Sequence, residues 1–420
     1  MFKNAQDLIE WIESQKRLTP KVSLERFRKI CALFGSPEKK QKYIHVGGTN
    51  GKGSTVAYLK NILREAGYNV GSYISPYVLS FNERISFNDC FISDEDLLSL
   101  GNEIIAKYPL LEAEELEKPS FFEFITLLAF LYFSRIENLD FVILEVGLGG
   151  LLDATNIVTP LVSVITSISY DHMSVLGNTL QEIALNKLGI VKPGVPLVTF
   201  SEAEILPQIT EVTDAKKSPL FLVAKQDICH IEASLEATIF DYKEYQKLKT
   251  PLLGFHQAEN AALAVEVFKI LQKDYRLTEE HLRNGLAKTI WPGRLQVLSK
   301  EPMILLDGAH NIGGVQSLIE FLKAIKKDRF LRIVFAVSHD KAKEAMIPLL
   351  ESVADEMVFS RYSYKRSDDA QMLFMLSKHS HKRVELDFEK LYHEALTDKN
   401  VMTVFCGSLY FVCDILRIYQ

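Results

Sequence analysis

The chain has few cysteines and no long apolar run. Its five cysteines are far apart and form neither CxxC pairs nor a spacing typical of zinc ligands. Cysteines this sparse are typical of reduced thiols, so we expect no disulfide framework. The longest apolar run, 124–133, is about half the length that a bilayer-spanning helix needs, and the first residues show no apolar signal segment. These absences predict a cytoplasmic protein that does not act in a membrane.

The chain also lacks an excess of positive charge. Its 48 Lys and Arg residues and 54 Asp and Glu residues give a net charge of −6. We therefore expect no dominant nucleic-acid-binding surface, and any anionic ligand must be held by local basic and backbone groups. The 420 residues exceed one compact core, and 47% hydrophobic and 24% charged residues are ordinary for a globular protein. We therefore expect two or three domains.

Short apolar runs rich in β-branched residues alternate with longer amphipathic segments. This alternation is typical of a mostly parallel sheet that is covered by helices. Two of the runs, 141–144 and 162–165, are almost entirely apolar, as central parallel strands should be. The expected strands are 43–47, 69–74, 141–146, 161–166, 196–200 and 220–224, and the expected helices include 52–67, 93–107, 119–136 and 179–188.

A second alternating series begins near residue 303. The junction before it contains Trp291-Pro292-Gly293-Arg294, where Pro-Gly breaks both helix and strand. The sequence therefore predicts an α/β protein with a P-loop-type, mostly parallel sheet domain over 1–294 and a smaller Rossmann-like α/β domain over 295–420. The expected strands of the second domain are 303–306, 331–337, 356–360, 383–387 and 401–406.

A glycine-rich turn, Gly48-Thr49-Asn50-Gly51-Lys52-Gly53-Ser54, joins a predicted strand to a predicted helix. Because glycine has no Cβ, backbone N–H groups in such a turn can converge on phosphate oxygens. Lys52 supplies a charge for the β- and γ-phosphates, and the Ser54 hydroxyl suits Mg²⁺. The spacing is not standard, since Gly53 separates these two residues. The strand–turn–helix setting favours a nucleoside triphosphate site over a flexible turn with a chance lysine.

Polar residues directly follow several predicted strands, where an α/β fold places its ligands. Glu145 follows the apolar run 141–144, and its carboxylate suits Mg²⁺, although a solvated charge is the alternative. Asp171-His172 follows another strand, yet a lone histidine is more often structural. Lys187 lies near a predicted helix end, where a lysine commonly complements the helix dipole.

Polar residues also directly follow the first predicted strand of the second alternating series. Asp307-Gly308-Ala309-His310-Asn311 follows the predicted strand 303–306 and leads into a predicted helix. The exposed N–H groups at the start of such a helix can bind phosphate. A nucleotide site with contributions from both predicted domains is therefore a reasonable expectation.

Taken in this order, the motifs resemble those of the folylpolyglutamate synthase/dihydrofolate synthase branch of the Mur ligase superfamily. The resemblance extends from about residue 40 to the C-terminus, nearly the whole chain. The segments that carry it are His45-Val46-Gly47-Gly48-Thr49-Asn50-Gly51-Lys52-Gly53-Ser54, Ser75-Pro76-Tyr77, Asn82-Glu83-Arg84-Ile85, Phe121-Phe122-Glu123-Phe124-Ile125-Thr126, Glu145-Val146-Gly147-Leu148-Gly149-Gly150, Leu152-Asp153-Ala154-Thr155-Asn156, Asp171-His172, Leu176-Gly177, Lys187 with Gly189-Ile190, Lys192-Pro193-Gly194, His256-Gln257-Ala258-Glu259-Asn260, Trp291-Pro292-Gly293-Arg294, Asp307-Gly308-Ala309-His310-Asn311 and Gly407-Ser408-Leu409-Tyr410.

The resemblance implies an ATP- and Mg²⁺-dependent ligase that adds L-glutamate to the γ-carboxylate of a reduced folate. The carboxylate attacks the γ-phosphoryl group of ATP and becomes an acyl phosphate, which the amine of L-glutamate then displaces. Phosphorylation neutralises the carboxylate and supplies a leaving group, so the protein contributes mainly positioning and charge neutralisation. We expect a cytoplasmic monomer without nucleic-acid or membrane partners.

The resemblance also implies roles for individual residues. The implied nucleotide contacts are Thr49, Asn50, Gly51, Lys52, Gly53, Ser54, Asn260, Arg294 and Asp307. The implied metal ligands are Ser54, Ser75, Glu145, His172 and Lys187, the last as a carbamate that offers oxygen ligands in place of an ammonium. The implied catalytic residues are Lys52, Lys187 and His310. The implied folate contacts are Phe121, Phe122, Glu123 and Asp153, since an aromatic face can stack on a flat ring.

Three departures from the family pattern leave alternatives open. Leu151 stands where relatives commonly carry arginine, and Tyr77 replaces a histidine of many bifunctional members. The sequence therefore leaves open whether the chain also makes dihydrofolate from dihydropteroate. Asn186 and Leu188 depart from the usual neighbours of the lysine at 187, which leaves its carbamylation open. A cell-wall precursor ligase and a nucleotide-binding module or small-molecule kinase are the other classes considered.

Overall fold

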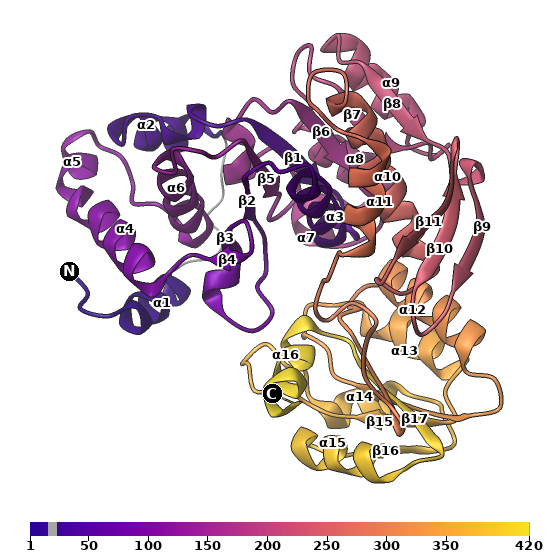
Figure 1. Cartoon of the computed structure of the whole chain (residues 1–420). Helices are drawn as coiled ribbons and strands as arrows, with labels where there is room; N and C mark the ends of the chain where they lie inside the picture. The colour runs from indigo at the N-terminus through magenta and orange to yellow at the C-terminus, as the bar shows by residue number, and fades with distance from the viewer. Residues whose placement is uncertain (16–22, 420) are drawn as a thin grey trace. The chain divides into compact units, whose positions relative to one another are not determined.

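The computed structural model describes residues 1–15 and 23–419. The chain folds into two compact units, each made of more than one chain segment. Unit 1 contains residues 1–225 and 260–285, and unit 2 contains residues 226–259 and 286–420. Each unit has its own central sheet, so the predicted mixed α/β fold is confirmed (Figure 1).

Unit 1 is built on an eight-stranded sheet with the order β4-β3-β2-β5-β1-β6-β7-β8. The six strands from β2 to β8 in this order are parallel, whereas β3 and β4 form an antiparallel edge. Every residue of β1, β5 and β6 is buried, as their apolar sequences predict for central strands. The strands are β1 Tyr43–Gly47, β2 Val70–Tyr73, β3 Ile85–Phe87, β4 Cys90–Phe91, β5 Phe141–Glu145, β6 Val162–Ile165, β7 Leu197–Phe200 and β8 Leu220–Val223.

Helices cover this sheet, and α3 packs on β1, β2 and β5. The helix bounds are α1 Ala5–Ser14, α2 Glu25–Leu33, α3 Lys52–Glu65, α4 Asp94–Ala106, α5 Tyr108–Ala113, α6 Phe121–Ser134, α7 Met173–Leu176, α8 Leu180–Leu188 and α9 Leu206–Ala215. Two further helices, α10 Phe255–Leu271 and α11 Glu279–Ala287, lie mostly in unit 1 and cross its boundary with unit 2. Short 3₁₀ turns are η1 Pro37–Lys39, η2 Phe81–Arg84, η3 Ala154–Ile157 and η4 Lys225–Asp227.

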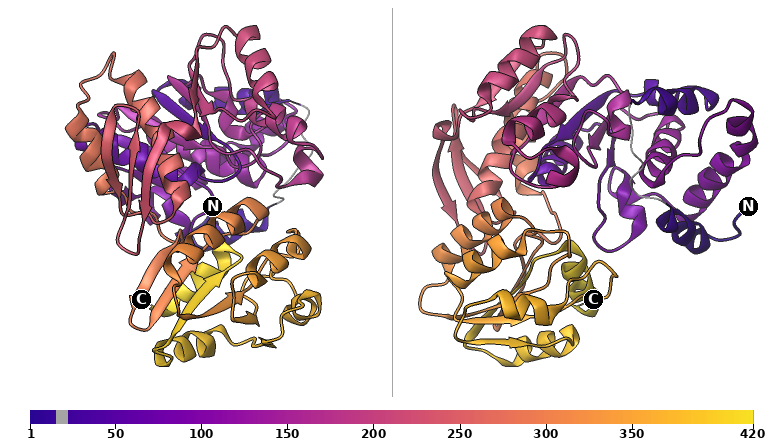
Figure 2. Two further views of the ribbon diagram at one scale, coloured as in Figure 1. Left: turned by 90° about the vertical axis from the view of Figure 1, so that its right-hand side faces the viewer. Right: turned by 180° about the vertical axis from the view of Figure 1, so that it is seen from behind.

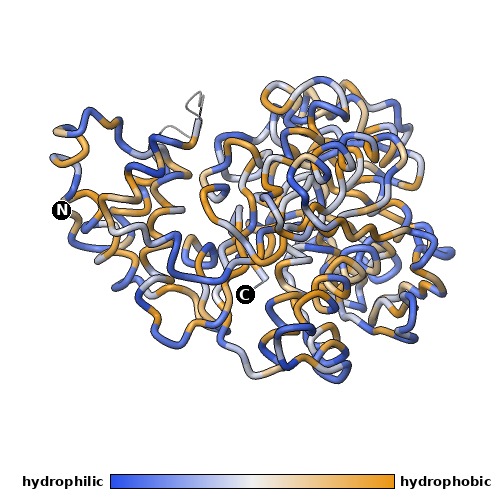
Figure 3. The backbone as a smooth tube through the Cα atoms, turned by 90° about the horizontal axis from the view of Figure 1, so that it is seen from above, coloured by the Kyte–Doolittle hydropathy of each residue, from blue (hydrophilic) through white to orange (hydrophobic). Residues whose placement is uncertain are grey.

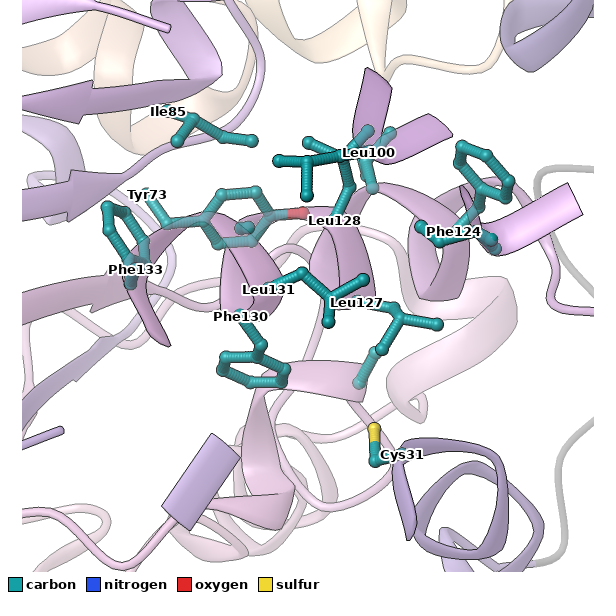
Figure 4. Close-up of a cluster of buried hydrophobic side chains, with 14 of the residues drawn as sticks. Cys31, Tyr73, Ile85, Leu100, Phe124, Leu127, Leu128, Phe130, Leu131 and Phe133 are labelled. Atoms are coloured by element: carbon teal, nitrogen blue, oxygen red, sulfur yellow. The ribbon is translucent and has the colours of Figure 1, made fainter. Parts of the chain in front are cut away.

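Helix α6 is apolar on nearly all sides because it is enclosed by other elements. Its side chains belong to one buried cluster with residues of β1, β2 and β5 and of α1, α2 and α4. Figure 4 shows Phe130, Phe133 and Leu128 of α6 in the same cluster as Tyr73 of β2 and Leu100 of α4. Burial of so many large side chains is the main stabilising contribution in this part of unit 1.

Unit 2 contains two sheets, which two further views display (Figure 2). A three-stranded antiparallel sheet has the order β11-β10-β9, and a six-stranded sheet has the order β12-β13-β17-β14-β15-β16. All strands of the larger sheet are parallel except β12 at its edge. The strands are β9 Ile228–Ala233, β10 Thr238–Tyr242, β11 Tyr245–Thr250, β12 Gln296–Lys300, β13 Met303–Asp307, β14 Phe330–Phe335, β15 Glu356–Phe359, β16 Lys382–Val384 and β17 Val401–Cys406.

The helices of unit 2 follow the parallel strands of its larger sheet. They are α12 Ile312–Ile325, α13 Lys343–Glu351, α14 Ala370–Leu376, α15 Phe388–Thr397 and α16 Leu409–Tyr419. Apolar and polar stretches alternate along the chain, as expected when strands and helices bury one side (Figure 3). Within residues 1–15 and 23–419, none of the helices combines the length and the apolar character needed to cross a bilayer.

Candidate active site

The glycine-rich turn joins β1 to α3 at the carboxyl end of the unit 1 sheet. Gly48 and Gly51 have φ angles of +137° and +87°, a region that other residues rarely adopt. A Cβ on Gly48 would lie 1.8 Å from Oγ1 of Thr166, and a Cβ on Gly51 would lie 2.1 Å from Oδ1 of Asn260. Both positions therefore require glycine, and Asn260 lies directly against the turn, as the predicted nucleotide site requires.

The turn is fixed by the segment that follows the neighbouring strand β6. The backbone N–H of Thr49 donates to the Ser167 carbonyl oxygen at 2.6 Å, and that of Asn50 donates to Oγ of Ser167 at 3.1 Å. Ser54 lies in the first turn of α3 and is buried. The strand, the turn and the helix start thus have the arrangement that the motif predicts.

Two lysines reach the backbone of this turn. Nζ of Lys52 donates to the carbonyl oxygens of Gly48 and Thr49, both at 3.1 Å. Nζ of Lys187, near the end of α8, donates to the same Gly48 oxygen at 2.8 Å. Burial is the main reason that the pKa of Lys187 is lowered from 10.5 to about 7, and the charge of Lys52 lowers it further. Lys187 therefore has a much larger neutral fraction at neutral pH than a surface lysine.

Two residues of the predicted metal set, Ser75 and Glu145, lie at the carboxyl ends of the neighbouring parallel strands β2 and β5. Glu145 ends β5 and is 5% exposed, and Ser75 lies two residues beyond β2. The backbone N–H of Ser75 donates to Oε2 of Glu145 at 3.1 Å, which brings these two residues together. His172 has a φ of +50° immediately before α7, and its Nε2 lies 3.9 Å from Oδ2 of Asp171.

The described residues contain no group of three or more His, Cys, Asp or Glu side chains arranged to hold a metal. The predicted set includes only two residues of these types, Glu145 and His172, together with two serines and a lysine. A carboxylate and hydroxyl oxygens are hard ligands that suit Mg²⁺, an ion that also keeps several waters and phosphate oxygens as ligands. The donor types therefore fit magnesium better than zinc.

The predicted folate residues 121–123 form the first turn of α6. A Cβ on Gly147 would lie 2.4 Å from Cζ of Phe122, so this ring packs directly on the loop after β5. Phe121 contacts Arg84, whose Cζ lies 5.6 Å from the centre of the ring. The loop between β5 and η3 and the start of α6 therefore form one surface.

Glu123 is buried and has polar partners of its own. It receives two hydrogen bonds from Nη2 of Arg26, at 2.7 Å to Oε1 and 2.6 Å to Oε2. It also accepts from the backbone N–H and the hydroxyl of Ser120, both at 2.9 Å, which completes a capping box for α6. These contacts give the carboxylate a structural role in holding α2 against the start of α6, whatever it binds.

Asp153 caps the short helix η3 and organises the loop before it. Its Oδ1 accepts from the backbone N–H and the hydroxyl of Thr155, at 2.9 and 2.6 Å. Its Oδ2 accepts from the backbone N–H of Leu148 at 2.9 Å. The side chain is thus held by short contacts on both carboxylate oxygens.

Unit 2 brings Arg294, Asp307 and His310 together at the carboxyl end of β13. Oδ2 of Asp307 accepts from the backbone N–H of Leu295 at 2.9 Å, and Oδ1 accepts from that of Ala309 at 2.8 Å. A Cβ on Gly308 would lie 2.4 Å from Nη1 of Arg294. Burial raises the pKa of Asp307, while Arg294 and the two backbone N–H groups oppose that rise.

His310 is oriented by a backbone contact in the same loop. Its Nδ1 donates to the Gly308 carbonyl oxygen at 2.8 Å, because a carbonyl oxygen can only accept. Asn311 follows as the N-cap of α12, its Oδ1 accepting from the N–H of Gly314 at 2.8 Å. The loop between β13 and α12 is therefore ordered by hydrogen bonds at each end.

Sequence patterns gave no signal for several residues that organise the site. Arg26 lies 97 residues from its partner Glu123, and Thr166 and Ser167 lie more than 110 residues from the turn that they hold. Pairs so distant in sequence have no fixed spacing, so no motif search identifies them. The spacing of Ser120 and Glu123 matches a capping box, but that spacing does not indicate a cationic partner for Glu123.

Comparison with known proteins agrees with this arrangement. The Mur ligase middle domain model matches residues 46–268, and the Mur ligase, glutamate ligase domain model matches residues 293–409. The dihydrofolate synthase/folylpolyglutamate synthase of Bacillus subtilis is 40% identical over 429 residues, covering 99% of this chain and 99% of the relative.

Solved structures are also similar over the whole chain. The folylpolyglutamate synthase of Thermotoga maritima has a TM-score of 0.85 and 33% identity, covering 99% of this chain and 96% of that one. E. coli FolC in complex with DHPP and ADP has a TM-score of 0.88 and 28% identity, covering 99% of this chain and 97% of that one. With both domain models matched and these relatives aligned almost end to end, the chain belongs to the folylpolyglutamate synthase/dihydrofolate synthase family of the Mur ligases.

Proposed function

We propose that this chain is an ATP-dependent ligase that adds L-glutamate to the γ-carboxylate of a reduced folate through an acyl phosphate. The observation that carries the proposal is the arrangement at the carboxyl end of the unit 1 sheet. There the glycine-rich turn, with Lys52 at the start of α3, lies beside the strand that ends in Glu145 and the adjacent strand that leads to Ser75. Phosphate-binding and metal-binding groups are thus supplied by neighbouring strands.

The turn 49–54 is assigned to the phosphates of ATP, together with Asn260. Backbone N–H groups at the start of α3 offer hydrogen bonds to phosphate oxygens, and Lys52 adds a positive charge. Asn260 contributes an amide directly against Gly51. In unit 2, Arg294 and Asp307 are assigned to the nucleotide, and His310 to a position near the transferred phosphate.

Mg²⁺ would be held by oxygen and nitrogen groups of Ser54, Ser75, Glu145 and His172, with Lys187 as a carbamate. When bound, the ion neutralises phosphate charge during phosphoryl transfer. The chain's own contribution is to hold Glu145 against the backbone of Ser75 and to lower the pKa of the Lys187 amine to about 7, which gives it a substantial neutral fraction at neutral pH, since only a neutral amine reacts with CO₂.

The folate is assigned to the surface formed by the start of α6 and the loop after β5. Phe121, which is 7% exposed, and Phe122 supply the aromatic side chains assigned to a flat ring, and Asp153 lies in the loop against which Phe122 packs. Glu123 is assigned to this surface as well, with Arg26 and Ser120 holding its carboxylate. We assign 1–294 as the ATP-binding central domain and 295–420 as the glutamate ligase domain, and propose a monomer that acts in the cytoplasm.

A second activity deserves a direct test, because the Bacillus subtilis relative carries both names, dihydrofolate synthase and folylpolyglutamate synthase. In that reaction dihydropteroate replaces the folate as the carboxylate donor, and L-glutamate is again the amine. The chain would then be bifunctional.

The experiment is ADP release by the purified chain with ATP, Mg²⁺ and L-glutamate. Tetrahydrofolate, dihydropteroate and a UDP-linked muramyl substrate are supplied in separate reactions, with D-glutamate as the control amine. We expect turnover with tetrahydrofolate and a product heavier by one glutamyl residue. Turnover with dihydropteroate as well establishes the second activity, and turnover with the muramyl substrate alone contradicts the proposal.

A further inference from the structure

A buried histidine lies beneath the folate-side loop, outside the set of residues with an assigned role. His45 is the third residue of the central strand β1, paired with Leu144 of β5 on one side and Ser163 of β6 on the other. Its side chain is 0% exposed. Because side chains alternate along a strand, it lies on the same face as Tyr43, which packs in the α6 core. A polar ring in such a place must be hydrogen-bonded to be tolerated.

The donor and the acceptor of each hydrogen bond that joins His45, Thr155 and Asp153 can be assigned. The Thr155 hydroxyl donates its proton to Oδ1 of Asp153 at 2.6 Å, because a carboxylate only accepts. The same hydroxyl lies 2.7 Å from Nε2 of His45. Since the hydroxyl proton is already used, Nε2 must carry a hydrogen and donate it. The chain of donors therefore runs from His45 through Thr155 to Asp153.

The ring is held neutral with its other nitrogen unprotonated. Burial, and secondly the charge of Lys192, lower the pKa of His45 to about 3. Among the residues that the structure describes, no polar group is hydrogen-bonded to Nδ1. A neutral ring with its proton on Nε2 satisfies Thr155, whereas the opposite tautomer would place two acceptors against each other.

Asp153 connects the hydrogen bonds of His45 and Thr155 to the loop after β5. Its second oxygen accepts from the N–H of Leu148, one residue beyond Gly147, whose backbone packs on the Phe122 ring. The loop that connects Glu145 to Asp153 is therefore held near its middle by the Asp153 carboxylate. That carboxylate is in turn held by His45 of β1 through the Thr155 hydroxyl. One chain of hydrogen bonds therefore connects β1, which leads into the phosphate-binding turn, to the proposed folate surface.

We propose that His45 is a positioning residue, which orients Asp153 through Thr155 and so shapes the binding site for the pteridine-bearing substrate. The inference rests on the proposed function, since it takes the loop 146–153 as part of the folate surface. His45 touches no reacting atom. It acts by supplying one proton donor at a fixed point in the core.

The first test is steady-state kinetics of His45→Phe, which keeps a planar ring but removes the donor. The KM for tetrahydrofolate should rise by roughly fivefold to tenfold, the size expected when one buried hydrogen bond is lost. The KM for ATP should stay within about twofold, because Ser167 and Thr166 hold the phosphate turn independently. His45→Gln, whose amide can place an N–H near the same point, should recover much of the loss.

A double-mutant cycle separates this role from general destabilisation. Thr155→Val removes the hydroxyl that connects His45 to Asp153, which is the relay between them. Adding His45→Phe to Thr155→Val should therefore raise the KM for tetrahydrofolate no further. Thr213→Val is the matched control, since Thr213 is a buried threonine on α9 whose hydroxyl donates to the Ile209 carbonyl oxygen at 2.9 Å. It should lower thermal stability without changing either KM. Additive effects of the two substitutions in the cycle would overturn the relay.

Selective ¹⁵N-histidine labelling gives a readout that needs no activity. The His45 resonances, identified by their loss in His45→Phe, should show protonated Nε2 and unprotonated Nδ1, unchanged between about pH 5 and pH 8. In Thr155→Val this signature should change. A ring that is protonated on Nδ1, or that titrates in this range, contradicts the inference. If wild-type chain shows the signature but does not turn over tetrahydrofolate, the proposed function fails while the hydrogen-bond chain stands.

Discussion

Lys187 and Lys52, 135 positions apart by their numbering, donate to one acceptor, the Gly48 carbonyl oxygen, at 2.8 and 3.1 Å. Lys187 is buried, whereas Lys52 is half-buried. Burial, and secondly the nearby charge of Lys52, therefore lower the pKa of Lys187 to about 7. A neutral amine next to the phosphate-binding turn is the chemical requirement for carbamate formation, so this geometry supports the proposed modification.

The first prediction concerns stability against pH in Lys187→Met. Between about pH 7 and pH 10 the unfolded chain holds a proton on Lys187 that the folded chain has released, so the wild type gains unfolding free energy as pH rises. Each tenfold change in acidity corresponds to about 1.4 kcal/mol, so the buried charge costs a few kcal/mol below pH 7. Urea unfolding with CO₂ excluded should show Lys187→Met more stable than wild type at pH 6, with the gap closing toward pH 10. A gap that does not vary with pH contradicts the shifted pKa.

The second prediction concerns the carbamate itself. Lys187→Ala should be nearly inactive, and short carboxylic acids such as acetate should partly restore ADP release by supplying the missing oxygens. Lys216→Ala is the control, because Lys216 also donates to a backbone carbonyl, that of Val191, and its pKa is lowered by burial, yet it has no assigned role. It should keep its activity and show no response to acetate. Normal turnover by Lys187→Ala would falsify the assignment.

The third prediction concerns the phosphate-binding turn. Lys52→Ala should lower kcat/KM by at least about 10³-fold, because a charge that stabilises phosphoryl transfer is lost. Its thermal unfolding temperature should change little, since Lys52 is only half-buried and water can also satisfy the carbonyl oxygens of Gly48 and Thr49 to which it donates. Lys60→Ala is the control in the same helix, where Nζ of Lys60 lies 3.4 Å from Oγ of Ser86. Equal activity of Lys52→Ala and Lys60→Ala would contradict the assignment of Lys52 to the phosphates.

The fourth prediction separates metal binding from packing at the strand ends. Glu145→Gln and His172→Ala should each raise the Mg²⁺ concentration needed for half-maximal activity, because each removes a proposed ligand. Mg²⁺ titrations at saturating ATP and folate measure this directly. Variants that unfold at lower temperature but keep the wild-type Mg²⁺ response would assign both residues a structural role instead.

The sequence predicted the parts of the fold that are specified locally. Apolar β-branched runs gave β1 and β17 with their observed bounds, and the glycine-rich turn gave the start of α3 at Lys52. The antiparallel sheet β9–β11 was missed, because only β10 buries alternate residues, β9 buries only its first residue, and all three strands carry charged residues. Such strands are stabilised by pairing and by one buried face, which periodicity in a short polar segment reveals weakly.

The site was predictable only as far as motifs extend. Residues placed at strand ends by the parallel sheet, such as Glu145 and Asp307, follow from the alternation of strands and helices. Contacts between distant segments do not, since no spacing encodes them. The bond from Lys187 to Gly48 and the relay from His45 to Asp153 became evident only when the strands were placed side by side.

The last prediction concerns Glu123, which has an implied folate role and a structural partner. Its side chain is 2% exposed and that of Arg26 is 25% exposed, so removing the arginine leaves a buried carboxylate with less compensation. Arg26→Met should therefore lower the unfolding free energy by about 2–4 kcal/mol. Arg135→Met, which breaks the exposed pair with Glu103, is the control and should cost less than about 1 kcal/mol. Adding Glu123→Gln to Arg26→Met should recover part of the lost stability, because no buried charge is then left. If the double variant regains stability and also keeps the wild-type KM for tetrahydrofolate, the carboxylate of Glu123 has only a structural role. The folate contact would then be assigned to Phe121 and Phe122.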